Sequence, residues 1–185
     1  TAAFLEDQDF FRFFGIFRNV TLKALPDAHM EDVWFQPVLN QDNSSGKVSV
    51  IMKVTAPEKQ NVDARFVLTD REGTVITEKC LQLQGRDGIF TGTIHTDVQN
   101  IKLWDNHSPY LYHACVELIE ENGVMLEVVP YDIGFRRLEV IDKVIYLNGK
   151  RLVITGVNRH EWNPKTGRCI GMQEMTADID CMLRN

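Results

Sequence analysis

The chain has 185 residues, of which 44% are hydrophobic and 25% are charged, so it has the composition of a globular protein with a sizeable core. Its net charge is −6 and its isoelectric point is about 5.4, which argues against a nucleic-acid partner, because phosphates are met by clustered basic side chains. No apolar run approaches the roughly 20 residues that span a bilayer, so we expect no membrane partner.

The first stretch in chain order, EDQDFFRFFGIFR at residues 6–18, combines three acidic residues with five phenylalanines. Aromatic side chains bury large areas, so we interpret the phenylalanines as core or interdomain packing. We expect Arg12 and Arg18 to pair with the acidic residues. The chain begins at Thr1, without a methionine or a signal segment, so we do not expect residue 1 to be a natural start.

Between residues 31 and 142 apolar and polar residues alternate, which is the period of half-buried strands. About seven short strands over roughly 110 residues, separated by turn signals, predict an immunoglobulin-like β-sandwich. The Asn122-Gly123 pair predicts a type I′ hairpin turn. The apolar faces are expected to contain Val48, Val50, Met52 and Val54, then Val62, Ala64, Phe66 and Leu68, then Phe90 and Ile94, and finally Tyr112, Ala114, Val116 and Leu118.

Two features limit what the sandwich can be. The antibody-type pattern of Cys, Trp and Cys is absent, so we interpret Trp104 as an edge or interface anchor and not as a core tryptophan. The four cysteines lack both metal-knuckle spacing and the density of a disulfide scaffold, which predicts reduced cysteines in an intracellular protein. Nothing in the sandwich alone converges into chemistry, so by itself it reads as a spacer or support module.

The C-terminal flank changes character. The Asn148-Gly149 pair predicts a hairpin between two short apolar strands, the second over residues 152–155, and the polar cluster of residues 158–161 follows. Apolar residues at helical spacing between residues 175 and 183 predict a helix. Strand, polar loop and helix form the repeating unit of α/β barrels, whose chemistry lies at the C-terminal ends of strands.

Three interpretations of the polar cluster remain open. A zinc site is disfavoured, because the fourth position after His160 is Pro164 and not a second histidine. A structural loop, in which His160 and Glu161 satisfy local hydrogen bonds, is the simplest interpretation of the residue types. The third interpretation is a substrate-binding loop in a pocket.

Five motifs in order resemble the bacterial β-galactosidases of glycoside hydrolase family 2. They are EDQDFFRFFGIFR, LW with PYLY around residues 103–112, DIGFR at 132–136, LNGKRLVI, and GVNRHEWNPKTGR. The resemblance implies an all-β fold class: residues 1–26 as the end of a jelly-roll sugar-binding domain, residues 27–139 as the sandwich, and residues 140–185 as the first strand and helix of a (β/α)₈ barrel. One departure is Phe10-Phe11, where other members carry Met-Trp.

This resemblance implies a retaining hydrolase of terminal β-D-galactosides such as lactose, with two glutamates about 5–5.5 Å apart. In the family both glutamates lie on later barrel strands, so we assign no catalytic residue here and expect the chain alone to be inactive. The implied partners are the galactoside and the remaining jelly-roll and barrel domains of a cytoplasmic enzyme, which we expect to be a homo-oligomer. The alternative is an immunoglobulin-like binding or adhesion module without a hydrolytic role.

Two substrate-binding residues are implied by the resemblance. Asp9 corresponds to an aspartate that binds galactosyl hydroxyls and a sodium ion, and a carboxylate suits such a hard cation. His160 corresponds to a histidine that contacts the sugar, and a contact that strengthens as the ring distorts accelerates hydrolysis. The family's magnesium site has its ligands beyond residue 185, so none of it is expected in this chain.

Overall fold

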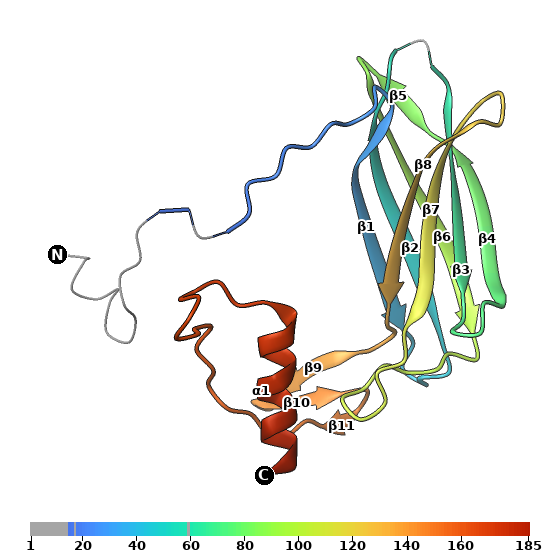
Figure 1. Cartoon of the computed structure of the whole chain (residues 1–185). Coiled ribbons are helices and arrows are strands. Elements are labelled where there is room, and N and C mark those ends of the chain that lie inside the picture. The colour runs from blue at the N-terminus through green and yellow to red at the C-terminus, as the bar shows by residue number, and fades with distance from the viewer. Residues whose placement is uncertain (1–14, 17, 59) are drawn as a thin grey trace. The chain divides into compact units, whose positions relative to one another are not determined.

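The computed structural model describes residues 15–16, 18–58 and 60–185 (Figure 1). It divides into two compact units, one comprising Ala24–Val153 and the other combining the segment up to Lys23 with Ile154–Asn185. In the described part, no helix combines the length and apolar character that crossing a bilayer requires. The expected phenylalanine packing and the predicted pairing of Arg12 concern residues outside the described ranges.

The described residues contain eleven strands and one helix, and all eleven strands belong to the larger unit (Figure 1). Their bounds are β1 His29–Leu39, β2 Ser45–Thr55, β3 Val62–Thr69, β4 Val75–Gln82, β5 Gln84–Arg86, β6 Ile89–Gln99, β7 Tyr112–Glu120, β8 Met125–Ile133, β9 Leu138–Ile141, β10 Val144–Leu147, β11 Lys150–Arg151 and α1 Met172–Arg184.

Two four-stranded antiparallel sheets face each other in the larger unit. One has the order β1-β2-β6-β5 and the other β4-β3-β7-β8, which is the arrangement of strands A-B-E-D and C′-C-F-G in immunoglobulin domains. The predicted all-β sandwich is therefore confirmed. A third sheet, β11-β10-β9, follows the sandwich in the same unit.

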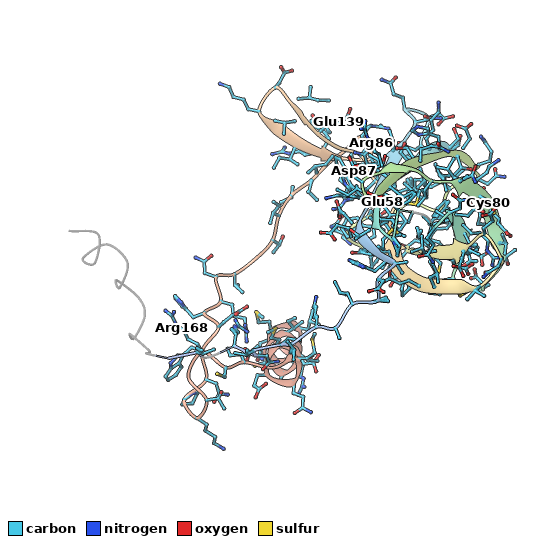
Figure 2. All side chains as sticks on the ribbon, turned by 90° about the horizontal axis from the view of Figure 1, so that it is seen from above. Glu58, Cys80, Arg86, Asp87, Glu139 and Arg168 are labelled. Carbon is cyan, nitrogen blue, oxygen red and sulfur yellow. The ribbon has the colours of Figure 1, made fainter. Side chains whose placement is uncertain are left out.

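The sandwich forms because its central strands alternate strictly between the two faces. β2 and β6 pair in continuous register from Ser45↔Gln99 to Thr55↔Ile89, which keeps every second side chain of both strands on the inner face. Side chains fill the space between the sheets (Figure 2). All apolar positions predicted from the alternation are buried: Val48, Val50, Met52, Val54, Val62, Ala64, Phe66, Leu68, Phe90, Ile94, Tyr112, Ala114, Val116 and Leu118.

Two local predictions at strand ends were wrong. Gly123 has a φ of 86° but Asn122 has no positive φ, so the predicted β7–β8 hairpin is closed by the four residues 121–124 and not by a two-residue type I′ turn. The pairing shifts between Leu118 and Ile119, which leaves Leu126 of β8 without a partner and forms a β-bulge. The second strand of the next hairpin is β11 at Lys150–Arg151 and not the predicted residues 152–155, although the N–H of Leu152 still donates to the carbonyl of Ile145 on β10 at 2.8 Å.

The turn predicted at Asn148-Gly149 is confirmed. Both residues have a positive φ, 53° and 80°, and Leu147 pairs with Lys150 across the turn. These are the features of a type I′ hairpin. A second turn with two positive φ values, at Asp142 and Lys143, joins β9 to β10 and was not predicted.

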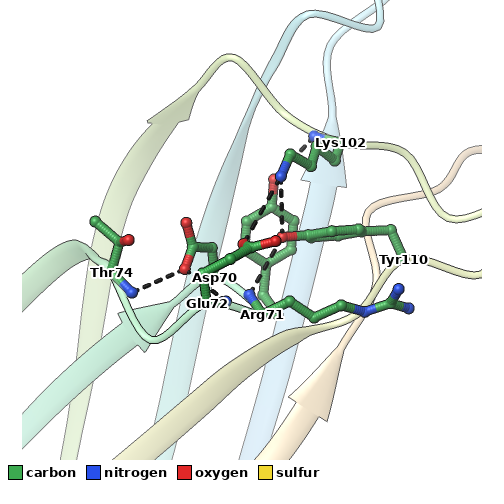
Figure 3. Close-up of polar contacts among 7 residues, drawn as sticks. Asp70, Arg71, Glu72, Thr74, Lys102 and Tyr110 are labelled. Atoms are coloured by element: carbon green, nitrogen blue, oxygen red, sulfur yellow. Dashed lines mark hydrogen bonds and ion pairs between the residues drawn. The ribbon is translucent and has the colours of Figure 1, made fainter.

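A polar cluster fastens the β3–β4 turn to the segment before β7 (Figure 3). The hydroxyl of Tyr110 accepts the backbone N–H of Arg71 at 3.2 Å, and Lys102 Nζ lies 4.8 Å from its ring centroid. The hydroxyl of Tyr112 accepts the backbone N–H of Lys102 at 2.8 Å, in the manner of the tyrosine corner of immunoglobulin domains. Burial raises the pKa of Tyr112.

Within this cluster, the carboxylate of Asp70 closes the turn. Its Oδ1 accepts the backbone N–H groups of Thr74 at 2.8 Å and Glu72 at 3.0 Å (Figure 3). The bond from Thr74 is the main reason that the pKa of Asp70 lies below its ordinary value of 3.8.

Phe66 is one of the two largest fully buried side chains of the core, so truncating it should leave a cavity. We predict that Phe66→Ala lowers the free energy of unfolding by about 3–5 kcal/mol in urea titrations. Val75→Ala, at an exposed position on β4, should change it by less than about 0.5 kcal/mol. Equal losses for the two variants would contradict the assigned core.

The Asp70 turn should make stability depend on acid. Because the pKa of Asp70 is lower in the folded chain, its contribution is present above the ordinary value of 3.8 and is lost as the pH falls through the folded value. We predict a smaller loss of unfolding free energy between pH 5 and pH 3 for Asp70→Asn than for the parent chain.

The matched control for this titration is Asp97→Asn. The Asp97 carboxylate lies 3.9 Å from Lys47 Nζ and accepts no backbone N–H among the described residues. Urea titrations of both variants at several pH values check the prediction. If the two variants lose stability in parallel, the turn is not the acid-sensitive element.

Candidate functional site

His160 lies in an exposed loop between Ile154 and helix α1. Its backbone carbonyl accepts the N–H of Trp162 at 2.9 Å, which makes a tight bend at the histidine. The structure therefore presents the imidazole on the surface of its unit and not in a core. An exposed imidazole on a bent loop is accessible to a ligand.

Both chain neighbours of His160 are anchored. Arg159 donates from Nε and Nη2 to Asp178 Oδ2 on α1, at 2.7 and 2.6 Å. Glu161 accepts a hydrogen bond from Arg18 Nη2 at 3.0 Å, although both side chains are more than half exposed, so this pair contributes little energy. The Arg159–Asp178 pair is therefore the contact that orders the loop, on the N-terminal side of His160.

The rest of the loop is ordered by its own backbone. Asn163 and Gly167 exchange two N–H···O bonds of 2.8 Å, and the hydroxyl of Thr166 donates to the carbonyl of Cys169 at 2.7 Å. Glu174 then accepts the N–H of Gly171 at 3.0 Å, which satisfies a donor at the start of α1. The helix predicted from the apolar spacing is confirmed.

The smaller unit also contains a hollow of about 330 Å³, lined by Arg18, Asn19, Cys169, Ile170 and Gly171. His160 is not among the lining residues. In the described ranges, no three His, Cys, Asp or Glu side chains lie close enough together to hold a metal ion. The zinc interpretation of the loop therefore gains no support from the geometry.

The structure describes only one of the two predicted substrate-binding residues. His160 is described, whereas Asp9, with its predicted sodium ion, lies outside the described residues. Arg18 pairs with an acidic residue of the His160 loop, a partner that the sequence did not indicate. The link between Arg159 and Asp178 was also missed, because neither charge spacing nor periodicity relates a loop to a later helix.

In the larger unit, Asn148 is a buried connector that the sequence indicated only as a turn residue. It is 7% exposed. Its Oδ1 accepts the N–H of Arg137 at 2.8 Å, and its Nδ2 donates to the carbonyl of Trp104 at 3.0 Å. Its own carbonyl accepts Nδ2 of Asn43 at 3.1 Å. One amino acid thus joins three segments that are far apart in sequence.

Arg137 completes this connection. Its Nη1 donates to the carbonyl of Asn40 at 2.8 Å and to Oδ1 of Asn43 at 2.9 Å, while Nε bonds Glu139 at 2.9 Å. We call Arg137 and Asn148 the connector pair. It ties the β9–β11 sheet to the β1–β2 loop and to the segment before β7.

Comparison with protein families gives two matches that follow each other along the chain. Glycosyl hydrolases family 2 matches residues 28–136. The TIM barrel domain of the same family matches residues 138–185. The first match covers the sandwich, and the second covers the β9–β11 sheet, which we call the connector sheet, together with the His160 loop and α1.

Curated relatives match over the whole chain. The β-galactosidase large subunit of Lactobacillus acidophilus is 44% identical over 186 residues, which is 100% of this chain and 29% of the relative. That of Leuconostoc lactis is 45% identical, with the same coverage. The β-galactosidase of Streptococcus thermophilus is 39% identical over 98% of this chain and 17% of its own length. The chain thus spans less than a third of these relatives.

Solved structures share the fold. A β-glucuronidase of Bacteroides uniformis superposes with a TM-score of 0.83 at 22% identity, covering 96% of this chain and 22% of that one. A second enzyme of that organism, β-glucuronidase 3, superposes with a TM-score of 0.77 at 25% identity, covering 94% and 21%. At 22% identity, the likeness to the first of these structures shows only that the fold is shared.

The connector pair predicts a specific stability effect. Asn148→Gly keeps the positive φ of 53° but removes both side-chain bonds, leaving the Arg137 N–H and the Trp104 carbonyl without this partner. We predict a loss of about 1–3 kcal/mol in unfolding free energy, measured by urea titration.

Asn100→Gly provides a matched control. Asn100 also has a positive φ, 54°, but it is exposed and its side chain makes no hydrogen bond within the described structure. Its replacement should leave stability almost unchanged. A similar loss for both variants would show that backbone conformation, and not the buried amide, decides the effect.

Proposed function

We infer that this chain, which belongs to glycosyl hydrolases family 2, forms part of a β-galactosidase that hydrolyses terminal β-D-galactosides such as lactose. The observation that carries this proposal is the 44% identity, over the whole chain, with a β-galactosidase large subunit. The reaction proposed is hydrolysis with retention, in which one carboxylate attacks the sugar and a second acts as acid and base.

Within that enzyme we assign residues 27–139 to an immunoglobulin-like support domain, which follows the end of a jelly-roll domain at residues 1–26. Residues 140–185 would supply the first strand and helix of the catalytic barrel. The strand order supports the first assignment, and the match of the barrel domain to residues 138–185 supports the second. That match also disfavours an adhesion module, for which the C-terminal flank would be incidental.

His160 is the residue of this chain that we propose to contact the galactosyl group. Its exposure and the bond of the neighbouring Arg159 to Asp178 support this role, because that bond orders the loop while the His160 side chain lies at the surface. A hydrogen bond from His160 to a sugar hydroxyl would tighten as the ring distorts towards the transition state.

Asp9 is proposed as the second contact, binding galactosyl hydroxyls and a sodium ion through its carboxylate. The family's magnesium ion and both catalytic glutamates would come from other parts of the enzyme, so the chain alone should not turn over substrate. Its partners are then the other domains of the same polypeptide, in a cytoplasmic homo-oligomer. The proposed cytoplasmic location rests on the spacing of the four cysteines, which lack the density of a disulfide scaffold.

Hydrolysis of a chromogenic β-galactoside by the full-length protein tests this function. We predict activity for the full-length enzyme and none for the 185-residue chain. His160→Ala should reduce kcat/KM by about 10- to 100-fold, which corresponds to the loss of one strengthened hydrogen bond.

His95→Ala is the control for this assay, because His95 lies on an outer face of the sandwich, where its ring bonds Ser49 at 2.9 Å. It should leave kcat/KM unchanged. A full-length protein without β-galactosidase activity would refute the proposed function, and equal losses for the two variants would refute the role of His160.

A further inference from the structure

An open groove of about 500 Å³ runs along the side of the sandwich where edge strands β1 and β8 meet. Its lining includes Trp34, Trp104, Tyr131 and Arg136. Trp34 is 59% exposed and Tyr131 is 51% exposed. Large aromatic side chains gathered on an open surface mark an interaction site. We call this feature the Trp104 groove.

Trp104 is held in one position within the groove. Its backbone N–H donates to the carbonyl of Phe135 at 2.9 Å, and its backbone carbonyl accepts the bond from Asn148 Nδ2 at 3.0 Å. A Cβ at Gly134 would lie 2.9 Å from the Trp104 Cβ, so this glycine lets the backbone pack against the indole. A rigid aromatic side chain loses little entropy when a partner binds it.

Arg136 supplies a charge with unused hydrogen-bonding capacity. Its guanidinium stacks 4.5 Å from the centroid of the Trp104 ring. Among the described residues it has no hydrogen-bond or ion-pair partner, in contrast to Arg137, which bonds Asn40, Asn43 and Glu139. A guanidinium that is already positioned by stacking recognises a carboxylate through two parallel bonds. Tryptophan and arginine together are typical of the centre of an interface.

The edges of β1 and β8 are closed to pairing with a further strand. Pro37 and a register shift after Met30 interrupt β1, and Pro130 interrupts β8. The carboxylate of Glu127 also accepts a hydrogen bond from the backbone N–H of Met30 at 2.6 Å. A partner must therefore dock through side chains, with an apolar group against the aromatic residues and a carboxylate against Arg136.

We propose that the Trp104 groove receives an acidic, apolar-bearing segment of the same polypeptide from outside these 185 residues. This rests on the proposed function, because the chain spans only 29% of the β-galactosidase large subunits that it matches. A tethered segment binds at an effective concentration in the millimolar range. A second copy would have to bury about 800 Å² per partner, whereas the groove is one small cleft.

Photo-crosslinking of the full-length enzyme tests the occupant. Tyr131 is replaced by the photoreactive residue p-benzoylphenylalanine, and Trp34 is replaced in a second variant. The control position is Met125, which lies on the same strand and is 52% exposed but does not line the groove. We expect cross-links from positions 131 and 34 at a yield at least fivefold above that from position 125.

The cross-linked product should keep the mass of one polypeptide on denaturing gels. Peptide mapping should identify a segment outside these 185 residues that contains aspartate or glutamate. A product of doubled mass would assign the groove to a second copy, and a product with another protein would assign it to an external partner; either result overturns the proposal. Equal yields from positions 131, 34 and 125 would show that the groove is unoccupied and would also overturn the proposal.

The role of Arg136 is tested in the same experiment. Arg136→Gln should lower the yield from position 131 at least threefold, whereas Arg86→Gln, at a side chain that is 91% exposed, should not. An unchanged yield with Arg136→Gln overturns the carboxylate contact. Hydrolysis of a chromogenic galactoside is measured in parallel. An active enzyme whose groove is unoccupied refutes only the docking proposal, whereas an inactive full-length protein refutes the proposed function.

Discussion

The buried amide of Asn148 is the interaction on which the larger unit depends beyond its hydrophobic core. It bonds Arg137 and Trp104 through its side chain and Asn43 through its carbonyl. Because a buried amide is costly unless it is fully bonded, these segments hold one another in a single arrangement. The side chain that bonds the N–H of Arg137 also bonds the carbonyl of Trp104, so the hairpin after the sandwich and the Trp104 groove share one support.

Two kinds of surface distinguish the parts of the chain. The sandwich buries its alternating apolar faces completely between its own sheets. After the connector sheet, in contrast, Ile154, Val157, Met172 and Leu183 are largely exposed, and α1 contains no buried residue. Exposed apolar residues at this density are typical of a surface that another element covers. In the proposed enzyme, the remaining strands and helices of the barrel would cover them.

The sequence predicted the sandwich well because strand alternation is a local pattern with a direct physical cause. Each apolar face from Val48 to Leu118 is buried as expected. The type I′ turn predicted at Asn122-Gly123 was wrong, although the hairpin is present, because a longer loop with a bulge competes for the same residues. The strand expected at 152–155 depends on pairing partners, which local apolar character cannot specify.

The candidate site was only partly predictable for the same reason. His160 was singled out by its motif, but the bonds that hold its loop join it to Arg18 and to Asp178 on the helix, and no local pattern indicates such pairs. Asn148 was recognised as a turn former, yet its larger role comes from contacts with Trp104 and Asn43, which lie 44 and 105 positions away in the sequence. Side chains of this kind become visible only when the fold brings their partners together.

The central claim is that this chain contributes to a galactoside-binding site that other parts of the enzyme complete. The most direct measurement is an experimental structure of the full-length protein with a bound galactoside inhibitor. We predict that an imidazole nitrogen of His160 lies within about 2.7–3.2 Å of a galactosyl hydroxyl. A bound inhibitor that contacts none of these 185 residues would contradict the account.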